Sequence, residues 1–396
     1  MKSNWEIKKL SDVCTIVNGG TPDTAVKRYW GDPLLWITPK DMGKSEQIFV
    51  DDTARKITME GLKNSSAKLL PVNSVILSSR APIGHLAINT KEIATNQGCK
   101  GLVPHKELDT FYLYYFLKNS VGLLNELGSG TTFKELSGTK LSTVEIPLPD
   151  RAEQLRIVTK VGEIFENADK EKRIAEINLE NIKELYRNYS QTVFEHTGDN
   201  WETKRLKEVC EKITDGTHQT PSYYENGYIF LSSRNVTSGK VNWDNVKYID
   251  EKQHTEMHKR VSPRIGDILL AKNGTTGVGA LVDRDVSFDI YVSLALLRVT
   301  NDITPEYLLY FVNSPFAKKQ FNKRLKGSGV PNLHLQEIKE VVISFPKSKQ
   351  EQNTTVLRLK GFLEQKQSLE RIYQQKIQHL EELKKSVLNK AFIGEL

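Results

Sequence analysis

Short apolar runs separated by glycine, proline and asparagine characterise residues 1–149. Apolar runs bounded by turn residues predict strands, and we expect them at residues 35–37, 75–77, 86–88, 101–103 and 144–148. Apolar residues at steps of three and four predict helices near residues 11–17, 58–64 and 108–118. The first 150 residues are therefore predicted to form an α+β domain.

The hydrophobic pattern changes completely after this domain. Residues 150–196 contain no proline and one glycine, and residues 347–396 again contain no proline. Apolar residues recur there at steps of three and four, which predicts two long amphipathic helices with a coiled-coil-like seam. Neither helix can bury its apolar stripe alone, so we expect the two to pack antiparallel with one globular domain at each end. The apolar positions of the two stripes are Ile157, Val161, Ile164, Ala168, Ala175, Ile182, Leu185 and Tyr189, then Val356, Leu359, Leu363, Leu369, Tyr373, Leu380, Leu383 and Val387.

The first half of the sequence recurs in the second half. The segment WEIKKLSDVC at 5–14 returns as WETKRLKEVC at 201–210, and Gly-Thr at 20–21 matches Gly-Thr at 216–217. This period is too long for a solenoid. The matched positions are mostly apolar residues, glycine and proline, whereas the polar stretches between them differ. The pattern indicates one scaffold that presents two different surfaces.

Together these patterns divide the chain into four parts. We expect a globular domain at 1–150, a long helix at 151–197, a second globular domain at 198–347 and a long helix at 348–396. The predicted fold class is α+β, with two pseudo-repeated domains joined by two long antiparallel coiled-coil-like helices.

Composition describes a globular protein of 396 residues, with 27% charged and 38% hydrophobic residues. The sequence has no apolar run long enough to span a bilayer and no signal peptide, so we expect a cytoplasmic protein. Three cysteines give no disulfide framework, and Cys14 and Cys210 are expected to be buried in the first helix of each domain. A net charge of +7 permits nucleic-acid binding without requiring it.

No catalytic constellation can be recognised. The Gly-Ser-Gly tripeptides at 128–130 and 327–329 fit turns and extend to neither a P-loop nor a dinucleotide fingerprint. His254 and His258 are spaced as ligands on one helix face, but no third ligand lies near them in sequence, so we predict no metal site. The Asn-Pro-Pro-aromatic motif of amino-methyltransferases is also absent. The chain is therefore predicted to be a non-catalytic binding protein without a cofactor of its own.

The order of motifs resembles the specificity subunits of type I restriction-modification enzymes. Each domain ends in IPLP at 146–149 or ISFP at 343–346, followed by a Glu-Gln pair and a long helix. The C-terminal segment LKKSVLNKAFIG at 383–394 resembles the closing motif of that family, and YSQTVF at 189–194 is its weaker counterpart. Unlike some members, the chain has no exact short repeat in its central helix.

This resemblance implies that each globular domain is a target recognition domain that reads half of an asymmetric, gapped site in double-stranded DNA. The paired helices set the gap and dock two methyltransferase subunits, which carry S-adenosylmethionine, while two restriction subunits with motor and nuclease activity join for cleavage. ATP and Mg²⁺ are expected on those partners, and no membrane is involved.

Candidate DNA-binding residues lie in the divergent polar loops of the repeat. Arginine is suited to guanine and asparagine to adenine, so Arg80 and Arg234 are candidates for guanine and Asn273 for adenine. Lys318, Lys319, Lys323 and Arg324 are expected to act on phosphates. The full set of candidates is Thr21, Lys40, Arg80, Thr132 and Lys134 in the first domain, then Thr217, Arg234, Lys272, Asn273, Lys319, Lys323, Arg324 and His334 in the second.

Two alternatives remain open. The chain could be the specificity subunit of a related restriction system that is not type I, or a coiled-coil interaction scaffold that binds no DNA. The modest charge of the domains favours the scaffold, whereas the ordered repeat and the motifs favour DNA recognition.

Overall fold

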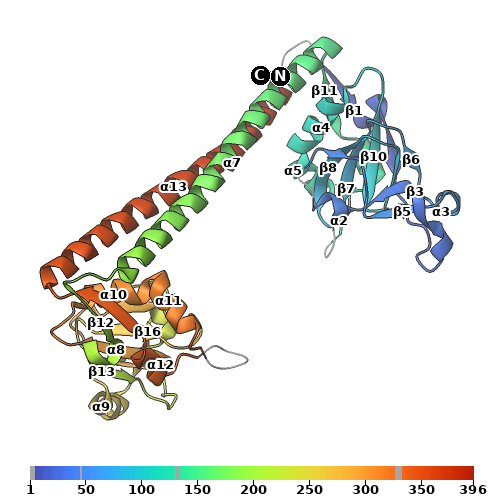
Figure 1. The fold of residues 1–396 in the computed structure, drawn as a ribbon. Helices are drawn as coiled ribbons and strands as arrows, with labels where there is room; N and C mark the ends of the chain where they lie inside the picture. The colour runs from blue at the N-terminus through green and yellow to red at the C-terminus, as the bar shows by residue number, and fades with distance from the viewer. Residues whose placement is uncertain (1–4, 45–46, 131–133, 326–331) are drawn as a thin grey trace. The chain divides into compact units, whose positions relative to one another are not determined.

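Each globular domain is closed by pairing its first strand with its last. In the first domain β1 (Glu6–Lys9) pairs antiparallel with β11 (Glu145–Leu148), and in the second β12 (Trp201–Arg205) pairs with β20 (Val342–Pro346). The computed structural model describes residues 5–44, 47–130, 134–325 and 332–396 (Figure 1). It divides into unit 1, Met1–Ala175 with Gln375–Leu396, and unit 2, Glu176–Gln374.

Unit 1 contains two further sheets. The larger has the order β2 (Cys14–Asn18), β10 (Cys99–Pro104), β7 (Val75–Ser79), β8 (Ile83–Asn89), β4 (Phe49–Val50). The smaller has the order β5 (Arg55–Ile57), β3 (Trp30–Ile37), β9 (Ile93–Thr95), β6 (Leu69–Leu70). Its helices are α1 (Leu10–Val13), η1 (Lys27–Tyr29), α2 (Pro39–Met42), α3 (Met59–Lys63), α4 (Thr110–Asn119), α5 (Val121–Leu127) and α6 (Gly138–Ser142).

Unit 2 repeats this plan. One sheet has the order β13 (Cys210–Asp215), β19 (Leu294–Val299), β16 (Ile268–Ala271), β17 (Gly279–Leu281). The other has the order β15 (Lys247–Ile249), β14 (Tyr228–Leu231), β18 (Phe288–Ile290). Its helices are α8 (Leu206–Val209), η2 (Ser233–Asn235), α9 (Glu251–Arg260), α10 (Pro305–Asn313), α11 (Pro315–Asn322) and α12 (Leu335–Lys339).

The predicted strands are confirmed, and the predicted helices are confirmed except the first. A helix at 11–17 was wrong, because α1 ends at Val13 and Cys14 begins β2. The backbone of β2 pairs with β10 over its whole length, and that ladder outweighs the helical spacing of its apolar residues. Cys14 and Cys210 are buried as expected, but both begin strands instead of lying within helices.

The long helices are α7 (Arg151–Glu195) and α13 (Lys349–Ile393), coloured green and red in Figure 1. In unit 1 Asp169 contacts Lys384, and Lys172 contacts Glu381 at 2.8 Å. In unit 2 the ring of Phe362 packs against Tyr186 and Tyr189. Residue numbers fall along α13 as they rise along α7, so the helices are antiparallel. The predicted fold class is thereby confirmed.

A buried glutamine anchors the start of each long helix to its domain. Gln154 Nε2 donates to Glu107 O and Pro149 O, and its Oε1 accepts from the Asp109 N–H. Gln352 makes the same set of bonds, to Asp302 O, Pro346 O and the N–H of Thr304. The repeat therefore extends to individual hydrogen bonds.

The far end of each long helix completes a core. Phe194 of α7 packs against Tyr307 and Phe311 in unit 2. Phe392 of α13 packs in the same way against Tyr112 and Phe116 in unit 1. Within the described residues, none of the helices has the length and apolar character that crossing a bilayer requires.

Candidate nucleic-acid interface

Polar residues gather at the ends of three strands in unit 2. Thr217 follows β13, Arg234 follows β14, and Lys272 follows β16. The turn between β18 and β19 joins these segments by backbone bonds: Ile290 O accepts from the Thr217 N–H at 3.0 Å and Ser293 O from the Lys272 N–H at 2.8 Å. Ser293 Oγ accepts from the N–H of Ser233, the residue before Arg234, at 3.0 Å.

Two more candidates join the same place from a distant segment. The N–H of Leu333 donates to Lys272 O at 3.0 Å, and Asn273 forms an isolated bridge with Asn332. His334 follows directly and is exposed at the start of α12. We call Thr217, Arg234, Lys272, Asn273 and His334 the strand-end cluster of unit 2. Among the described residues, the amide oxygens of Asn273 and Asn332 are buried and have no hydrogen-bond partner.

The backbone of unit 1 forms the same frame. Gly20 N–H donates to Thr95 O at 2.8 Å, and Ser79 N–H donates to Gly98 O at 2.7 Å. Leu136 N–H donates to Ser79 O at 2.8 Å, as Leu333 N–H does to Lys272 O. Ser79 therefore occupies the position of Lys272. The next residue, Arg80, bridges Glu135 as Asn273 bridges Asn332.

The side chains on this frame differ between the units. We call Thr21, Lys40, Arg80 and Lys134 the strand-end cluster of unit 1. The guanidinium of Arg80 lies 3.8 Å from the Glu135 carboxylate, and a Cβ on Gly98 would meet both Arg80 Nε and Pro39 Cγ at 3.0 Å. Lys40, next to Pro39, and Lys134 are exposed. Thr132 lies outside the described residues.

Asn96 and Gln97 belong to the cluster of unit 1, although the sequence did not single them out. Asn96 Nδ2 donates to Thr21 Oγ1 at 3.1 Å, and the Thr21 hydroxyl donates to the Gln97 amide oxygen. Both amides lie in the turn between β9 and β10, which corresponds to the turn before Ser293 in unit 2. A strand prediction for residues 93–95 would have pointed to this turn.

A β-bulge shifts the register of the repeat by one residue. β2 pairs with β10 without interruption, whereas β13 carries one extra residue between Cys210 and Lys212. Cys210 still corresponds to Cys14, but Thr217 takes the backbone position of Gly20. Thr21 and Thr217, which the sequence repeat aligns, therefore do not occupy equivalent positions in the structure. His218 occupies the position of Thr21. A bulge inserts a residue without lengthening the partner strand, so the sequence repeat hides it.

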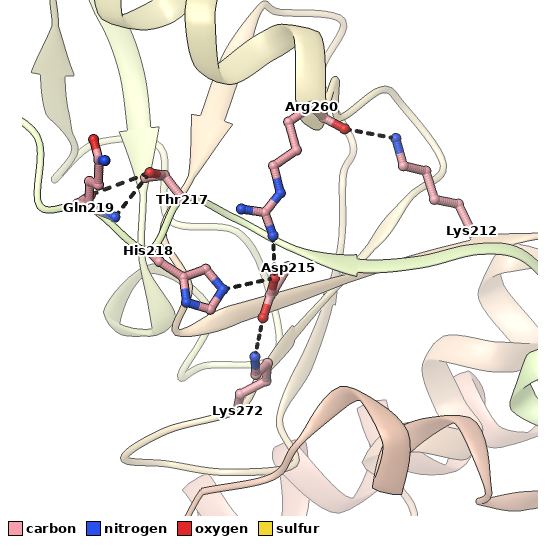
Figure 2. A network of polar contacts seen from close by, with 7 residues as sticks. All are labelled: Lys212, Asp215, Thr217, His218, Gln219, Arg260 and Lys272. Atoms are coloured by element: carbon pink, nitrogen blue, oxygen red, sulfur yellow. Dashed lines mark hydrogen bonds and ion pairs between the residues drawn. The ribbon is translucent and has the colours of Figure 1, made fainter.

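A buried carboxylate organises the cations of unit 2 (Figure 2). Asp215 lies 2.5 Å from the Lys272 ammonium, 3.1 Å from Arg260 Nη2 and 3.4 Å from His218 Nε2. The side chain of Lys272 is only 7% exposed, so its ammonium group pairs with Asp215 instead of facing solvent. Arg260 and His218, which the sequence did not single out, remain exposed beside it. In unit 1 the equivalents of Asp215 and Lys272 are Asn18 and Ser79.

A cleft of about 330 Å³ lies beside this network. The segment 216–221 forms one wall, and α9 with Asp289 and Ile290 forms the other. His218, Gln219 and Thr220 are exposed on the first wall. Exposed polar side chains in a loop are suited to contacts with base edges or phosphates.

The basic cluster predicted from sequence is divided by the structure. Lys318 and Lys319 on α11 are exposed, as is Lys323 just after it. Arg324 instead donates to the Gln320 carbonyl at 3.0 Å and is half-buried. The exposed lysines are therefore the better placed phosphate contacts.

We predicted no metal site because no third ligand lies near His254 and His258 in sequence. In the structure Asp289 on β18 contacts both imidazoles and provides the third group. Strand pairing brings this carboxylate to α9 from more than 30 residues away, which no local spacing reveals.

Comparison with known proteins gives a consistent result. Residues 2–179 and 198–381 each match the family described as type I restriction modification DNA specificity domain. The specificity subunit of the type I restriction enzyme MjaIX from Methanocaldococcus jannaschii is 30% identical over 363 residues, covering 87% of this chain and 83% of the relative. The specificity subunit of EcoKI from Escherichia coli K12 is 23% identical over 428 residues, covering 100% and 90%.

Solved structures share the fold. A chain from a study of complex assembly and conformational transition in a type I R-M system superposes with a TM-score of 0.80 at 20% identity, covering 100% of this chain and 99% of that one. The HsdS subunit from Thermoanaerobacter tengcongensis gives a TM-score of 0.66 at 18% identity, covering 100% and 98%.

Proposed function

The chain belongs to the family of type I restriction-modification DNA specificity proteins, and on that premise we propose that it selects the DNA sequence on which such an enzyme acts. It recognises an asymmetric site in double-stranded DNA that consists of two half-sites separated by a gap. It performs no chemistry and holds no cofactor, so S-adenosylmethionine, ATP and Mg²⁺ bind to its partner subunits. We also expect it to act in the cytoplasm, where chromosomal DNA lies.

The observation that carries this proposal is the duplicated frame with different side chains. The same backbone bonds hold Arg80 in unit 1 and Asn273 in unit 2, yet an arginine prefers guanine and an asparagine prefers adenine. Two copies of one frame with different side chains read two different half-sites. A bipartite and asymmetric target follows directly.

Phosphate contacts supply affinity without sequence preference. Lys319 and Lys323 in unit 2 and Lys40 in the strand-end cluster of unit 1 are exposed, which supports a role in phosphate contact. In this proposal they fix each domain on the duplex, while the polar residues at the strand ends contact base edges.

The long helices serve assembly. Apolar side chains remain exposed along the part that belongs to unit 2, including Ile177 at 60%, Leu185 at 58% and Leu357 at 67%. Exposed apolar side chains along one element favour docking of other proteins. We propose that two methyltransferase subunits bind there, that two restriction subunits join them, and that the helices set the gap.

The experiment is adenine-methylation mapping by long-read sequencing of the host genome, with and without this gene. Loss of one gapped, asymmetric motif on deletion, restored by the gene on a plasmid, is the expected result. If no motif disappears while the neighbouring methyltransferase gene is expressed, the proposal is wrong and a scaffold without DNA binding replaces it. A motif lost without any restriction subunit in the complex identifies a related system instead.

A further inference from the structure

Three metal-ligating side chains meet in unit 2 beside the cleft. His254 and His258 lie one turn apart on α9, and Asp289 is the middle residue of β18. One ligand atom from each lies within 4.8 Å of the others. The two oxygens of the Asp289 carboxylate face the two Nδ1 atoms, at 2.6 Å for His254 and 3.4 Å for His258. Both imidazoles therefore face the same carboxylate.

We propose that His254, His258 and Asp289 bind one divalent transition-metal ion, with Zn²⁺ as the best chemical match. Two imidazole nitrogens and one carboxylate oxygen form a ligand set that suits Zn²⁺, at metal–ligand distances of about 2.0–2.2 Å. Tetrahedral coordination at those distances separates the ligand atoms by about 3.3 Å. The 3.4 Å between His258 Nδ1 and Asp289 Oδ1 matches this value, whereas the 2.6 Å between His254 Nδ1 and the other oxygen, Oδ2, has to open by less than about 1 Å. Small rotations of the imidazole and of the carboxylate bring both nitrogens and one carboxylate oxygen to the ion.

The surroundings of His254 fit a ligand held in place. Its Nε2 lies 3.2 Å from the Ser287 hydroxyl, and its ring stacks on Tyr228 with centroids 3.8 Å apart. A metal-ligating histidine characteristically donates its other N–H to an oxygen, which fixes the tautomer and the ring orientation. With Nε2–H donating to Ser287, Nδ1 directs its lone pair at the ion.

Burial and exposure at the site also fit. The Asp289 side chain is 1% exposed and contacts both histidines, whereas the His258 side chain is 31% exposed. A cation bound by Asp289 and the two histidines offsets the cost of burying the carboxylate charge. The open side near His258 gives the ion access and leaves a coordination position for water.

The ion has a structural role in this arrangement. It links α9 to β18, and the next residue of β18, Ile290, holds the Thr217 segment through its carbonyl. Arg260, at the end of α9, reaches Asp215. The ion therefore ties together α9 and β18, the two elements that form one wall of the cleft. Unit 1 has Ala94 at the position of Asp289, and α3 carries no histidine, so the site belongs to unit 2 alone.

The test uses the untagged full-length chain, because a polyhistidine tag would bind the same ions. After treatment with a chelator and dialysis, calorimetric titration with ZnCl2 is expected to give one ion per chain and a higher Tm. Co²⁺ alone is expected to give the visible absorption of a site with nitrogen and oxygen ligands. His258→Ala and Asp289→Asn are expected to lower the affinity for Zn²⁺ at least about 100-fold. Even residues that only hydrogen-bond to the metal ligands of such sites contribute about 10–100-fold.

The matched control is His379→Ala, which removes an exposed histidine of α13 and is expected to bind Zn²⁺ like the unaltered chain. Since His258 is half-buried, its alanine variant should fold, and equal melting of the two metal-free proteins checks this. Absence of binding by the unaltered chain at micromolar Zn²⁺, or equal binding by His258→Ala, overturns the proposal and leaves a purely hydrogen-bonded cluster. Neither measurement involves DNA or partner subunits, so the outcome is independent of the proposed function.

Discussion

Lys272 and Asp215 form a buried ion pair at the end of β16, with their charged atoms 2.5 Å apart and both side chains less than a tenth exposed. The pair fixes the loop that presents Asn273. Asp215 also contacts Arg260 and His218. The negative charge next to the Lys272 ammonium comes from Asp215.

Replacing Asp215 should therefore destabilise unit 2 strongly. We expect Asp215→Ala to lower its free energy of unfolding by about 3–5 kcal/mol, because a buried ammonium then lacks its counter-charge. Urea denaturation measures this. The double variant with Lys272→Met should recover a substantial part of the loss, and Lys240→Met, at an exposed position, should change stability by less than about 0.5 kcal/mol. A small effect of Asp215→Ala alone would mean that water reaches Lys272 in solution.

Arg80 and Asn273 should each affect one half-site. Arg80→Ala is expected to cost about 1–3 kcal/mol in discrimination at one base pair and to relax only the half-site read by unit 1. Asn273→Ala should do the same for the other half-site. Methylation mapping of cells that carry each variant gives both motifs at once. Relaxation of both half-sites by one variant would contradict base reading by separate domains.

Lys319 and Lys323 should act without regard to sequence. Replacing each by alanine is expected to weaken DNA binding equally for matched and unrelated duplexes, and to reduce the slope of log K against log salt by about 1 per lysine. Titration of the assembled methyltransferase complex at several salt concentrations measures the slope. Lys106→Ala, at an exposed position of unit 1 outside the strand-end cluster and the long helices, is the control. An altered methylation motif in the lysine variants would instead assign them to base contacts.

The equivalent aromatic residues Phe194 and Phe392 should stabilise different units. Phe392→Ala is expected to destabilise unit 1 by about 3–5 kcal/mol, since a large side chain leaves a buried aromatic cluster. Hydrogen exchange should then accelerate in α4 and remain unchanged in α10. Phe194→Ala should give the reverse pattern, and equal acceleration in both helices would show that the units unfold together.

The three cysteines should resist thiol reagents in the folded chain. Burial raises the pKa of Cys14, Cys99 and Cys210 from 9.0 to about 12, so the reactive thiolate is scarce at pH 8. A colorimetric thiol reagent should label the native protein slowly and the urea-unfolded protein rapidly. Because only the unfolded chain releases these protons near its ordinary pKa, stability should fall as pH rises above about 9. Rapid labelling of the native chain would mean that a cysteine opens to solvent.

Local pattern was sufficient for much of this fold. The apolar run at Val75–Ser79 predicted a buried strand, and the steps of three and four from Ile157 to Tyr189 predicted α7. The repeat predicted two copies of one domain. The strand and the helix depend on neighbouring residues, and the repeat can be read by comparing two segments of the sequence, so neither needs the assembled fold.

The remaining features depend on residues far apart in the chain. Cys14 is in a strand because its backbone pairs with β10. The extra residue in β13 shifts Thr217 by one position relative to the first domain. Lys272 was predicted to contact DNA, yet Asp215, which is distant in sequence, engages its charge. Asp289 meets His254 for the same reason. Such pairings become visible only when the sheets are assembled.

Phe392, four residues from the C-terminus, completes the core of the domain that begins at Trp5. A ribosome that adds 5–20 residues per second needs about 12–50 s to make the roughly 240 residues between the end of the first globular domain and this side chain. During that interval Tyr112 and Phe116 lack their aromatic neighbour. The domain that is synthesised first is thus completed only after residue 392 has been made, and a nascent chain halted before that residue has its defect in the N-terminal core.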